Sequence, residues 1–368
     1  IVFAALGRRS GSTAGVAGYV AEAFGPLAGR MTGWCFLAGV VTGAPVVCLI
    51  GGNYVADFFG AGTTTALVAA GLLLVIVIAA SSIGARGSVW LQLSLVGTLV
   101  VMVLIAVLGS VAFSRGENWA SFAPHGIWSI GRAAANLMLS FVGWEAVASL
   151  TSRLRDPQRQ LPRVIGLAFV ATTIIYLGVA ATTVAVLGSA AGGTVPIARL
   201  LAFSLHGFAP VVAAVGAVVV TLAATNAYIT GGAALASTLL APRSTTDTSR
   251  RPVHRRIPQA IALAGVLLLG GLWLDVLSFV TVIAIPTTFF LAVYVAATGA
   301  AARTFSGPIR LVAMIACAAS TAVLLFVGWT IALPAAIVVV MSARRFLVGA
   351  SRSGALERNA DPAGNRIS

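Results

Sequence analysis

The stretch MTGWCFLAGVVTGAPVVCLIGGNYVA, residues Met31–Ala56, contains no charged residue. A helix needs about 20 consecutive apolar residues to cross the hydrocarbon core of a bilayer. This run is therefore long enough to span a membrane, and it predicts a transmembrane helix.

Similar runs recur through the chain and predict ten spans in all. The other nine are placed in Phe58–Ala85, Gly87–Ser114, Ala133–Ser152, Val164–Leu187, about Pro210–Leu240, Ile257–Ala302 (two spans, with Asp275 at the turn) and Leu311–Ala343 (two spans, with a turn at Gly328). A single helix over the last run would be about 50 Å long, well beyond a core of roughly 30 Å. The segment before Pro210 is expected to be an extramembrane loop.

The composition agrees with this pattern. Of 368 residues, 59% are hydrophobic and only 9% are charged, against about 25% charged in a typical soluble domain. Soluble globular proteins and disordered chains are both excluded. The net charge of +14 invites nucleic-acid binding, but the basic residues do not gather on one soluble face. The chain is interpreted as an all-α polytopic membrane protein embedded in a lipid bilayer, with no nucleic-acid partner.

The basic residues follow the span count. All 23 are arginine, and alternating the spans from a cytoplasmic N-terminal loop leaves only Arg115, Arg132 and Arg199 outside. Cytoplasmic loops of membrane proteins are enriched in positive charge. We therefore expect both ends of the chain to be cytoplasmic. Residues 1–348 are predicted to form one transmembrane domain, and residues 349–368 a disordered tail.

Glu145 is the one acidic residue that this span count places inside the membrane. A charged residue there is costly, so it needs a partner or takes up a proton. Gly143 weakens the helix just before it. Two readings are open: Glu145 contacts substrate or carries a proton in a broken helix, or it is a structural hydrogen-bonding residue at a helix interface.

The sixth span also carries polar side chains, at Thr225, Asn226, Tyr228 and Thr230. They either hydrogen-bond to neighbouring helices or line a water-filled cavity. Enzyme signatures such as a zinc-binding His pair, a phosphate-binding glycine loop or a serine elbow are absent from the sequence. The three cysteines lack metal-site spacing. We expect neither enzymatic activity nor a cofactor or metal site.

Two blocks of sequence resemble the amino acid–polyamine–organocation superfamily of permeases. The first resembles the loop after the family's second helix, and the second resembles its sixth helix and the loop that follows. The first block is carried by Ala14-Gly15, Tyr19, Ala23-Phe24-Gly25 and Gly33-Trp34, and the second by Phe141-Val-Gly-Trp-Glu145, Arg155-Asp156-Pro157 and Leu161-Pro162-Arg163. Within the superfamily, the start is most similar to bacterial exporters of methionine and branched-chain amino acids.

The resemblance implies a leucine-transporter-like fold of two inverted five-helix repeats, with helices one and six broken at the midplane. Such proteins are expected to have twelve helices. The ten spans would be helices three to twelve, and we expect the sequence to be a fragment that lacks helix one and most of helix two. Spans one to three would complete the first repeat, spans four to eight would form the second, and spans nine and ten would be peripheral.

The resemblance also implies a function and a site. The chain is expected to be a secondary active transporter in a bacterial cytoplasmic membrane, exporting neutral apolar amino acids of the leucine or methionine type with protons as the coupling ion. The substrate-binding residues would be Phe141, Val142, Gly143, Trp144, Glu145 and Asn226. Two alternatives stay open: a proton-coupled importer of amino acids or polyamines, and a transport-inactive sensor or truncated product. The sequence leaves the oligomeric state undetermined.

Overall fold

The computed structural model describes residues 2–9, 15–82, 89–120, 126–144, 156–240 and 250–343, and all regular structure within these ranges is helical. Eight of the described helices are long and apolar enough to cross a bilayer. The all-α polytopic membrane fold predicted from the sequence is confirmed. The predicted tail, residues 349–368, lies outside the described residues.

The long helices coincide with predicted spans. They are α3 (Pro26–Phe58), α4 (Thr63–Ser82), α5 (Val89–Ser110), α8 (Pro157–Leu187), α10 (Ala209–Leu240), α11 (Arg250–Trp273), α12 (Phe279–Thr304) and α13 (Gly307–Leu324). Four shorter α-helices accompany them: α1 (Val2–Arg9), α2 (Gly15–Phe24), α6 (Ile127–Leu137) and α9 (Pro196–Leu205). The 3-10 turns are η1 (Val111–Phe113), η2 (Gly116–Trp119), η3 (Met138–Phe141), η6 (Gly188–Gly192), η7 (His206–Phe208) and η8 (Gly328–Ile331).

Both predicted hairpin turns are confirmed. Asp275 is exposed, has a φ of 55° and lies between α11 and α12. Gly328 has a φ of 73°, a left-handed conformation that glycine adopts readily, and the chain is helical again from Gly328 to Ala343. The last apolar run is therefore two helices joined by a turn.

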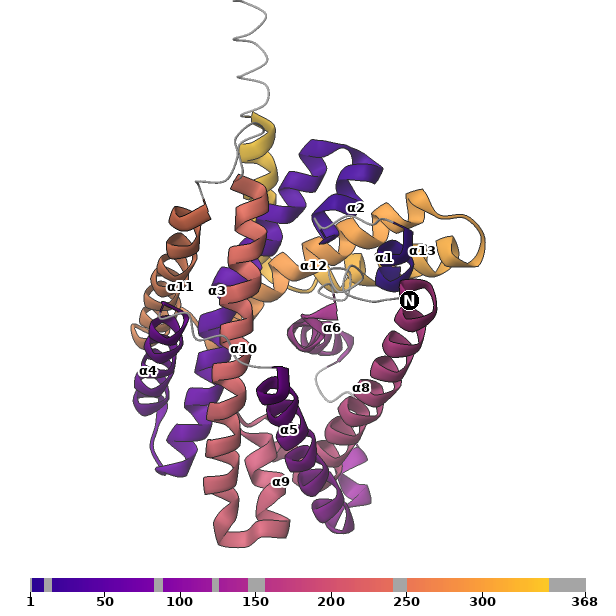
Figure 1. Ribbon diagram of the computed structural model, residues 1–368. Coiled ribbons are helices and arrows are strands. Elements are labelled where there is room, and N and C mark those ends of the chain that lie inside the picture. The colour runs from indigo at the N-terminus through magenta and orange to yellow at the C-terminus, as the bar shows by residue number, and fades with distance from the viewer. Residues whose placement is uncertain are drawn as a thin grey trace, which may run out of the picture.

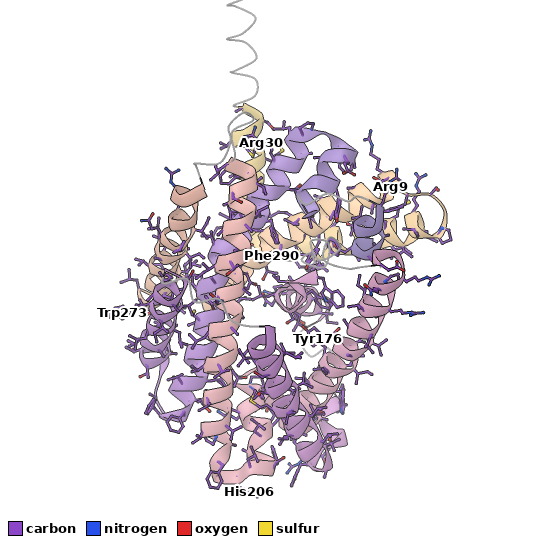
Figure 2. The ribbon with its side chains drawn as sticks, in the orientation of Figure 1. Arg9, Arg30, Tyr176, His206, Trp273 and Phe290 are labelled. Carbon is purple, nitrogen blue, oxygen red and sulfur yellow. The ribbon has the colours of Figure 1, made fainter. Side chains whose placement is uncertain are left out.

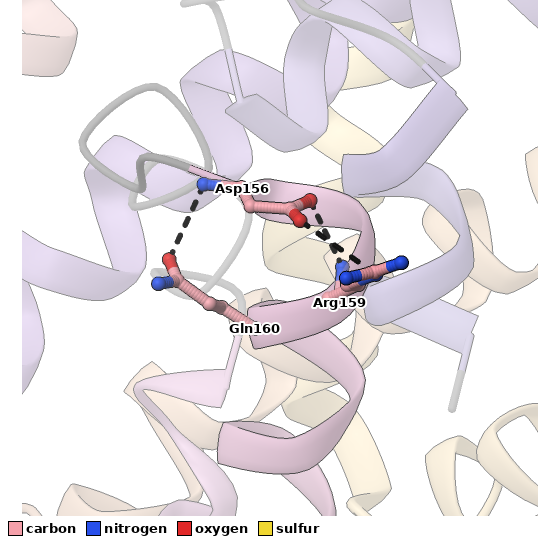
Figure 3. A network of polar contacts seen from close by, with 3 residues as sticks. All are labelled: Asp156, Arg159 and Gln160. Atoms are coloured by element: carbon pink, nitrogen blue, oxygen red, sulfur yellow. Dashed lines mark hydrogen bonds and ion pairs between the residues drawn. The ribbon is translucent and has the colours of Figure 1, made fainter.

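The start of α8 is fixed by its own first residues. Asp156 caps the helix, because its Oδ1 accepts a hydrogen bond of 3.3 Å from the backbone N–H of Arg159 (Figure 3). The Oε1 of Gln160 accepts in return from the backbone N–H of Asp156 at 3.4 Å. Pro157 occupies the first helical position, where its missing N–H costs nothing. Asp156 and Pro157, which carry part of the family resemblance, thus have a local structural role.

Helix α3 is the centre of the bundle. Most of α3 and α12 is buried, whereas α8 and α13 have few buried residues. Helix α3 packs tightly against α10, where Cys48 Sγ lies 3.5 Å from Thr225 Oγ1. A side chain on Gly51 would collide with Thr221, so this glycine permits the close approach of the two helices.

The two long helices run in opposite directions. Arg30, near the start of α3, lies at the top of the molecule with Arg9, and His206, just before α10, lies at the bottom (Figures 1 and 2). Helix α3 packs against both α4 and α11, and α10 likewise packs against both. This reciprocal, antiparallel packing agrees with the predicted inverted repeats, in which α3 and α10 are equivalent helices.

The segment expected to be a loop before the sixth span is helical instead. Helix α9 begins with Pro196 in its first turn and ends at Leu205, where His206 follows with a φ of 47°. Its Leu200 and Leu201 are fully buried, and it packs against α5 and α10. These apolar residues bury themselves as one side of a short helix, which forms a hairpin with α10 (Figure 1).

Candidate functional site: a broken membrane helix

The fourth predicted span is broken where the sequence predicted it. Helix α6 ends at Leu137, tightens into the 3-10 turn η3, and then leaves helical geometry at Val142, which is extended. Gly143 follows with a φ of 118°, a conformation that residues other than glycine rarely adopt. An unbroken α-helix through Gly143 is thereby excluded. Glu145 lies outside the described residues.

Two consecutive carbonyl groups at the break are held by tyrosine hydroxyls. Tyr176 of α8 donates a hydrogen bond of 2.7 Å to the carbonyl oxygen of Ser140. Tyr294 of α12 donates a hydrogen bond of 2.7 Å to the carbonyl oxygen of Phe141. A helix that stops inside a membrane exposes carbonyls that lipid cannot satisfy. The two hydroxyls therefore stabilise the broken end of α6.

Aromatic rings surround these carbonyls. The ring of Phe141 meets the ring of Tyr176 edge-on, with ring centroids 5.9 Å apart. The ring centroids of Trp144 and Phe169 lie 6.4 Å apart. Val142 turns inward to an aromatic cluster centred on Phe290. This Phe290 cluster consists of Val40, Phe290 and Tyr294, with Phe3, Phe36, Met138, Val142 and Tyr228 packed against it. The break thus has an aromatic wall on the side of α8 and a packed aromatic core on the side of α12.

The structure brings Phe141, Val142, Gly143 and Trp144 together as one turn, but it places Asn226 differently. Asn226 is half-buried on α10, and its carbonyl accepts a hydrogen bond from the Thr230 hydroxyl. Tyr228 is the α10 residue that packs with Val142 in the Phe290 cluster. Residues two apart on an α-helix point roughly 200° apart, so Asn226 lies on another side of α10 from Tyr228. A role for Asn226 in binding stays a prediction.

The sequence reading missed Tyr176 and Tyr294. Each is a tyrosine inside an otherwise apolar span, and a buried tyrosine hydroxyl usually needs a partner. That pattern could have marked them as polar contacts, but it names no partner. The partners lie 36 and 153 residues away in the chain, and only the fold brings them together.

The turn between the last two spans packs against α6. Phe326 packs against Trp128, with ring centroids 5.2 Å apart, and a side chain on Gly131 would collide with Phe326. The buried hydroxyls of Thr288 and Thr330 lie 2.7 Å apart and join α12 to this turn. Spans nine and ten were expected to be peripheral. Helix α13 is largely exposed, but its C-terminal turn contacts the helix that carries the break.

Comparison with known proteins bears on what this arrangement does. The sequence profile of a family described as "Amino acid permease" matches residues 1–330 of the chain. The L-methionine/branched-chain amino acid exporter YjeH of Escherichia coli (strain K12) is 31% identical over 180 residues, which are 48% of this chain and 43% of the exporter. The uncharacterized amino acid permease YecA of Bacillus subtilis (strain 168) is 26% identical over 345 residues, which are 88% of this chain and 78% of that permease.

A shorter match involves the branched-chain amino acid permease BcaP of Bacillus subtilis (strain 168). It is 33% identical over 82 residues, which are 22% of this chain and 17% of that permease. The chain thus covers less than half the length of the exporter and most of the length of the permease YecA.

Proposed function

The chain belongs to the amino acid permease family, and from that premise we propose that it transports neutral apolar amino acids across a bacterial cytoplasmic membrane. Transport would proceed by alternating access around the break that follows α6. We further propose export coupled to protons, with both ends of the chain in the cytoplasm.

The observation that carries this proposal is the pair of carbonyls at the end of α6. The C-terminal end of a helix carries a partial negative charge of about half an elementary charge. Ser140 is exposed at this end, and its carbonyl accepts a hydrogen bond from Tyr176. A carbonyl has a second lone pair. The α-ammonium group of an amino acid is a cationic donor that suits this acceptor.

The walls of the break favour an apolar side chain on the substrate. Phe141, Tyr176, Trp144 and Phe169 present aromatic rings, and the described part of the break contains no charged side chain. Burial of apolar surface against these rings would stabilise a bound leucine or methionine side chain. The names of two relatives, an L-methionine/branched-chain amino acid exporter and a branched-chain amino acid permease, support the same substrate class.

Proton coupling rests on Glu145, the acidic residue that the span count places inside the membrane beside the break. An ionisable residue in a membrane helix is a functional candidate because burial of its charge is costly. A neutral substrate does not need this carboxylate as a counter-ion, which leaves it free to carry a proton. Net export would then follow from the gradients of protons and of substrate.

Transport assays on the native protein test the proposal. The protein is reconstituted in proteoliposomes, and uptake and efflux are measured with labelled leucine, methionine, lysine, glutamate and putrescine, with and without a pH gradient. Leucine and methionine should be transported. An imposed proton gradient should drive their accumulation on the side from which the protons flow. Preference for lysine or putrescine would support the cationic-substrate importer instead, and no movement of any of the five compounds would contradict a transport function.

A further inference from the structure

The two tyrosines at the break differ in their surroundings, although their hydrogen bonds have the same length. Tyr176 is 39% exposed, and Ser140, whose carbonyl it binds, is exposed as well. Tyr294 is only 6% exposed and lies inside the Phe290 cluster. One hydroxyl thus reaches the break from an open side, and the other from the packed core.

We infer that Tyr294 is a fixed brace for the break, and that Tyr176 is an exchangeable cap whose hydroxyl yields the Ser140 carbonyl to the ammonium group of the substrate. The inference rests on the proposed function, and it names two positioning residues for that function.

The exchange at Ser140 follows from hydrogen-bond chemistry. Without substrate, the Tyr176 hydroxyl donates to the carbonyl of Ser140 and so occupies this acceptor. An ammonium group is a charged donor, and a charge-assisted hydrogen bond is roughly twice as strong as a neutral one. The substrate can therefore take over this acceptor. The ring of Tyr176 meets Phe141 edge-on and is 39% exposed, so the hydroxyl has room to move away.

The carbonyl of Phe141 has no such freedom. Its partner Tyr294 also contacts the ring of Phe3, with centroids 5.5 Å apart, and packs beside Phe290. A substrate cannot approach this side without opening the cluster. Loss of the Tyr294 hydroxyl would leave the Phe141 carbonyl unsatisfied, with or without substrate. The turn would then relax and carry the neighbouring Ser140 carbonyl out of position.

Two conservative substitutions should consequently change substrate affinity in opposite directions. In Tyr176→Phe the hydrogen bond to the Ser140 carbonyl is absent, so the substrate no longer has to displace it. We expect the KM and the dissociation constant for leucine to fall by about tenfold, which corresponds to about 1.4 kcal/mol. In Tyr294→Phe we expect the KM to rise by about the same factor, together with a lower melting temperature.

Tyr54→Phe is the matched control. Tyr54 is a tyrosine of the same bundle, and its hydroxyl hydrogen-bonds to the backbone of Ile197, away from the break. Its substitution should lower the melting temperature and leave the KM unchanged. The three variants are compared with the wild-type protein by leucine transport in proteoliposomes, by equilibrium binding of labelled leucine in detergent and by thermal unfolding.

The outcomes separate this inference from the function on which it rests. If the wild-type protein transports no amino acid, the proposed function fails and the inference fails with it. If the wild type transports leucine but Tyr176→Phe has an unchanged or higher KM, the exchangeable cap is wrong. If Tyr294→Phe behaves like Tyr54→Phe, with a lower melting temperature and an unchanged KM, the brace is wrong.

Discussion

The hydroxyl of Tyr294 lies 2.7 Å from the carbonyl oxygen of Phe141, although 153 residues separate them in the chain. Helix α12, which carries Tyr294, is one of the two most deeply buried helices of the bundle. Its neighbours in the Phe290 cluster include residues of α1, α3 and α10. The position of the break is thus set by the buried centre of the fold, and a substitution in that centre should change the conformation of the break.

Gly143→Ala tests whether the positive φ of this residue is needed. A Cβ atom at Gly143 would meet no atom of the described residues within 4 Å, so the expected cost comes from the backbone conformation. A φ of 118° is disfavoured for alanine by about 1–3 kcal/mol. We expect lower thermal stability and a loss of transport of roughly tenfold or more, as the turn shifts toward a helical conformation.

Gly166→Ala is the control for this substitution. Gly166 also has open space around it, but it lies inside α8, and its φ is not positive. Alanine is favoured over glycine within a helix by roughly 0.5–1 kcal/mol, so this variant should be as stable as the wild type or more so, with normal transport. Normal activity of Gly143→Ala would show that the break does not depend on the glycine conformation.

Tyr19→Phe should stabilise the protein. Tyr19 is 2% exposed at the junction of α1, α2, α12 and α13, and its hydroxyl has no hydrogen-bond partner within the described ranges. An unsatisfied buried hydroxyl costs about 1 kcal/mol or more. Its removal should raise the melting temperature at neutral pH, whereas Tyr54→Phe, which loses a hydrogen bond, should lower it.

The same residue predicts a pH dependence. Burial, with a smaller contribution from Glu22, raises the pKa of Tyr19 from 10.0 to about 12. The unfolded chain therefore releases this proton at lower pH than the folded protein does. Below pH 10 Tyr19 is neutral in both states and its ionisation does not affect stability; as the pH rises from 10 toward 12 the unfolded chain ionises first, and the folded protein loses stability. Between these pH values the melting temperature of Tyr19→Phe should fall less steeply with pH than that of the wild type. Parallel curves of melting temperature against pH would contradict this assignment.

How far the sequence predicts this structure depends on the distance over which each feature is encoded. The spans, the Asp275 turn and the Gly328 turn follow from local runs of apolar residues and their interruptions. The break near Gly143 follows from a glycine beside an intramembrane acid and from the family resemblance. The tyrosine contacts at Ser140 and Phe141 join distant segments, and no local pattern encodes them.

The polar group of the sixth span shows a different limit. Thr225, Asn226, Tyr228 and Thr230 were read as one polar feature, but helical geometry spreads them around α10. Thr225 is fully buried against Cys48 of α3, Tyr228 faces the Phe290 cluster, and Thr230 is exposed. The neighbours of α10 decide what each residue does, and these neighbours come from other parts of the chain.

The topology can be tested with introduced cysteines. The arginine distribution predicts that Thr246 faces the cytoplasm and that the segment around Asn118 faces outside. Thr246 lies outside the described residues; Asn118 bonds to the carbonyl of Ala185, so the exposed neighbour Glu117 is the better probe. An impermeant thiol reagent applied to intact cells should label Glu117→Cys and not Thr246→Cys. Labelling of Thr246→Cys alone would overturn the span assignment.

The native cysteines give this experiment a low background. Cys35 and Cys48 are buried, and Cys317 is half-buried within α13. The wild-type protein labelled in parallel measures what they contribute. Labelling of both introduced cysteines after permeabilisation of the cells would show that each site is reactive when the reagent can reach it.

Glu145→Gln tests the proton role. Glutamine keeps the size and hydrogen-bonding capacity of glutamate but cannot ionise, so folding should survive. If Glu145 carries the coupling proton, the variant should still bind leucine and should lose the pH dependence of transport, measured from about pH 5.5 to 8. Glu117→Gln, which changes an exposed acid in the η2 turn, should keep the wild-type profile.

Each other role of Glu145 has its own signature in the same measurements. A carboxylate that pairs with a cationic substrate would mainly lose binding, because one partner of a buried charge pair is removed. A structural carboxylate would lose expression and thermal stability, while the residual transport keeps its pH profile. We expect the first outcome, lost pH dependence with retained binding, because a neutral substrate has no need of this charge. A pH profile of Glu145→Gln that matches the wild type would rule out the proton role.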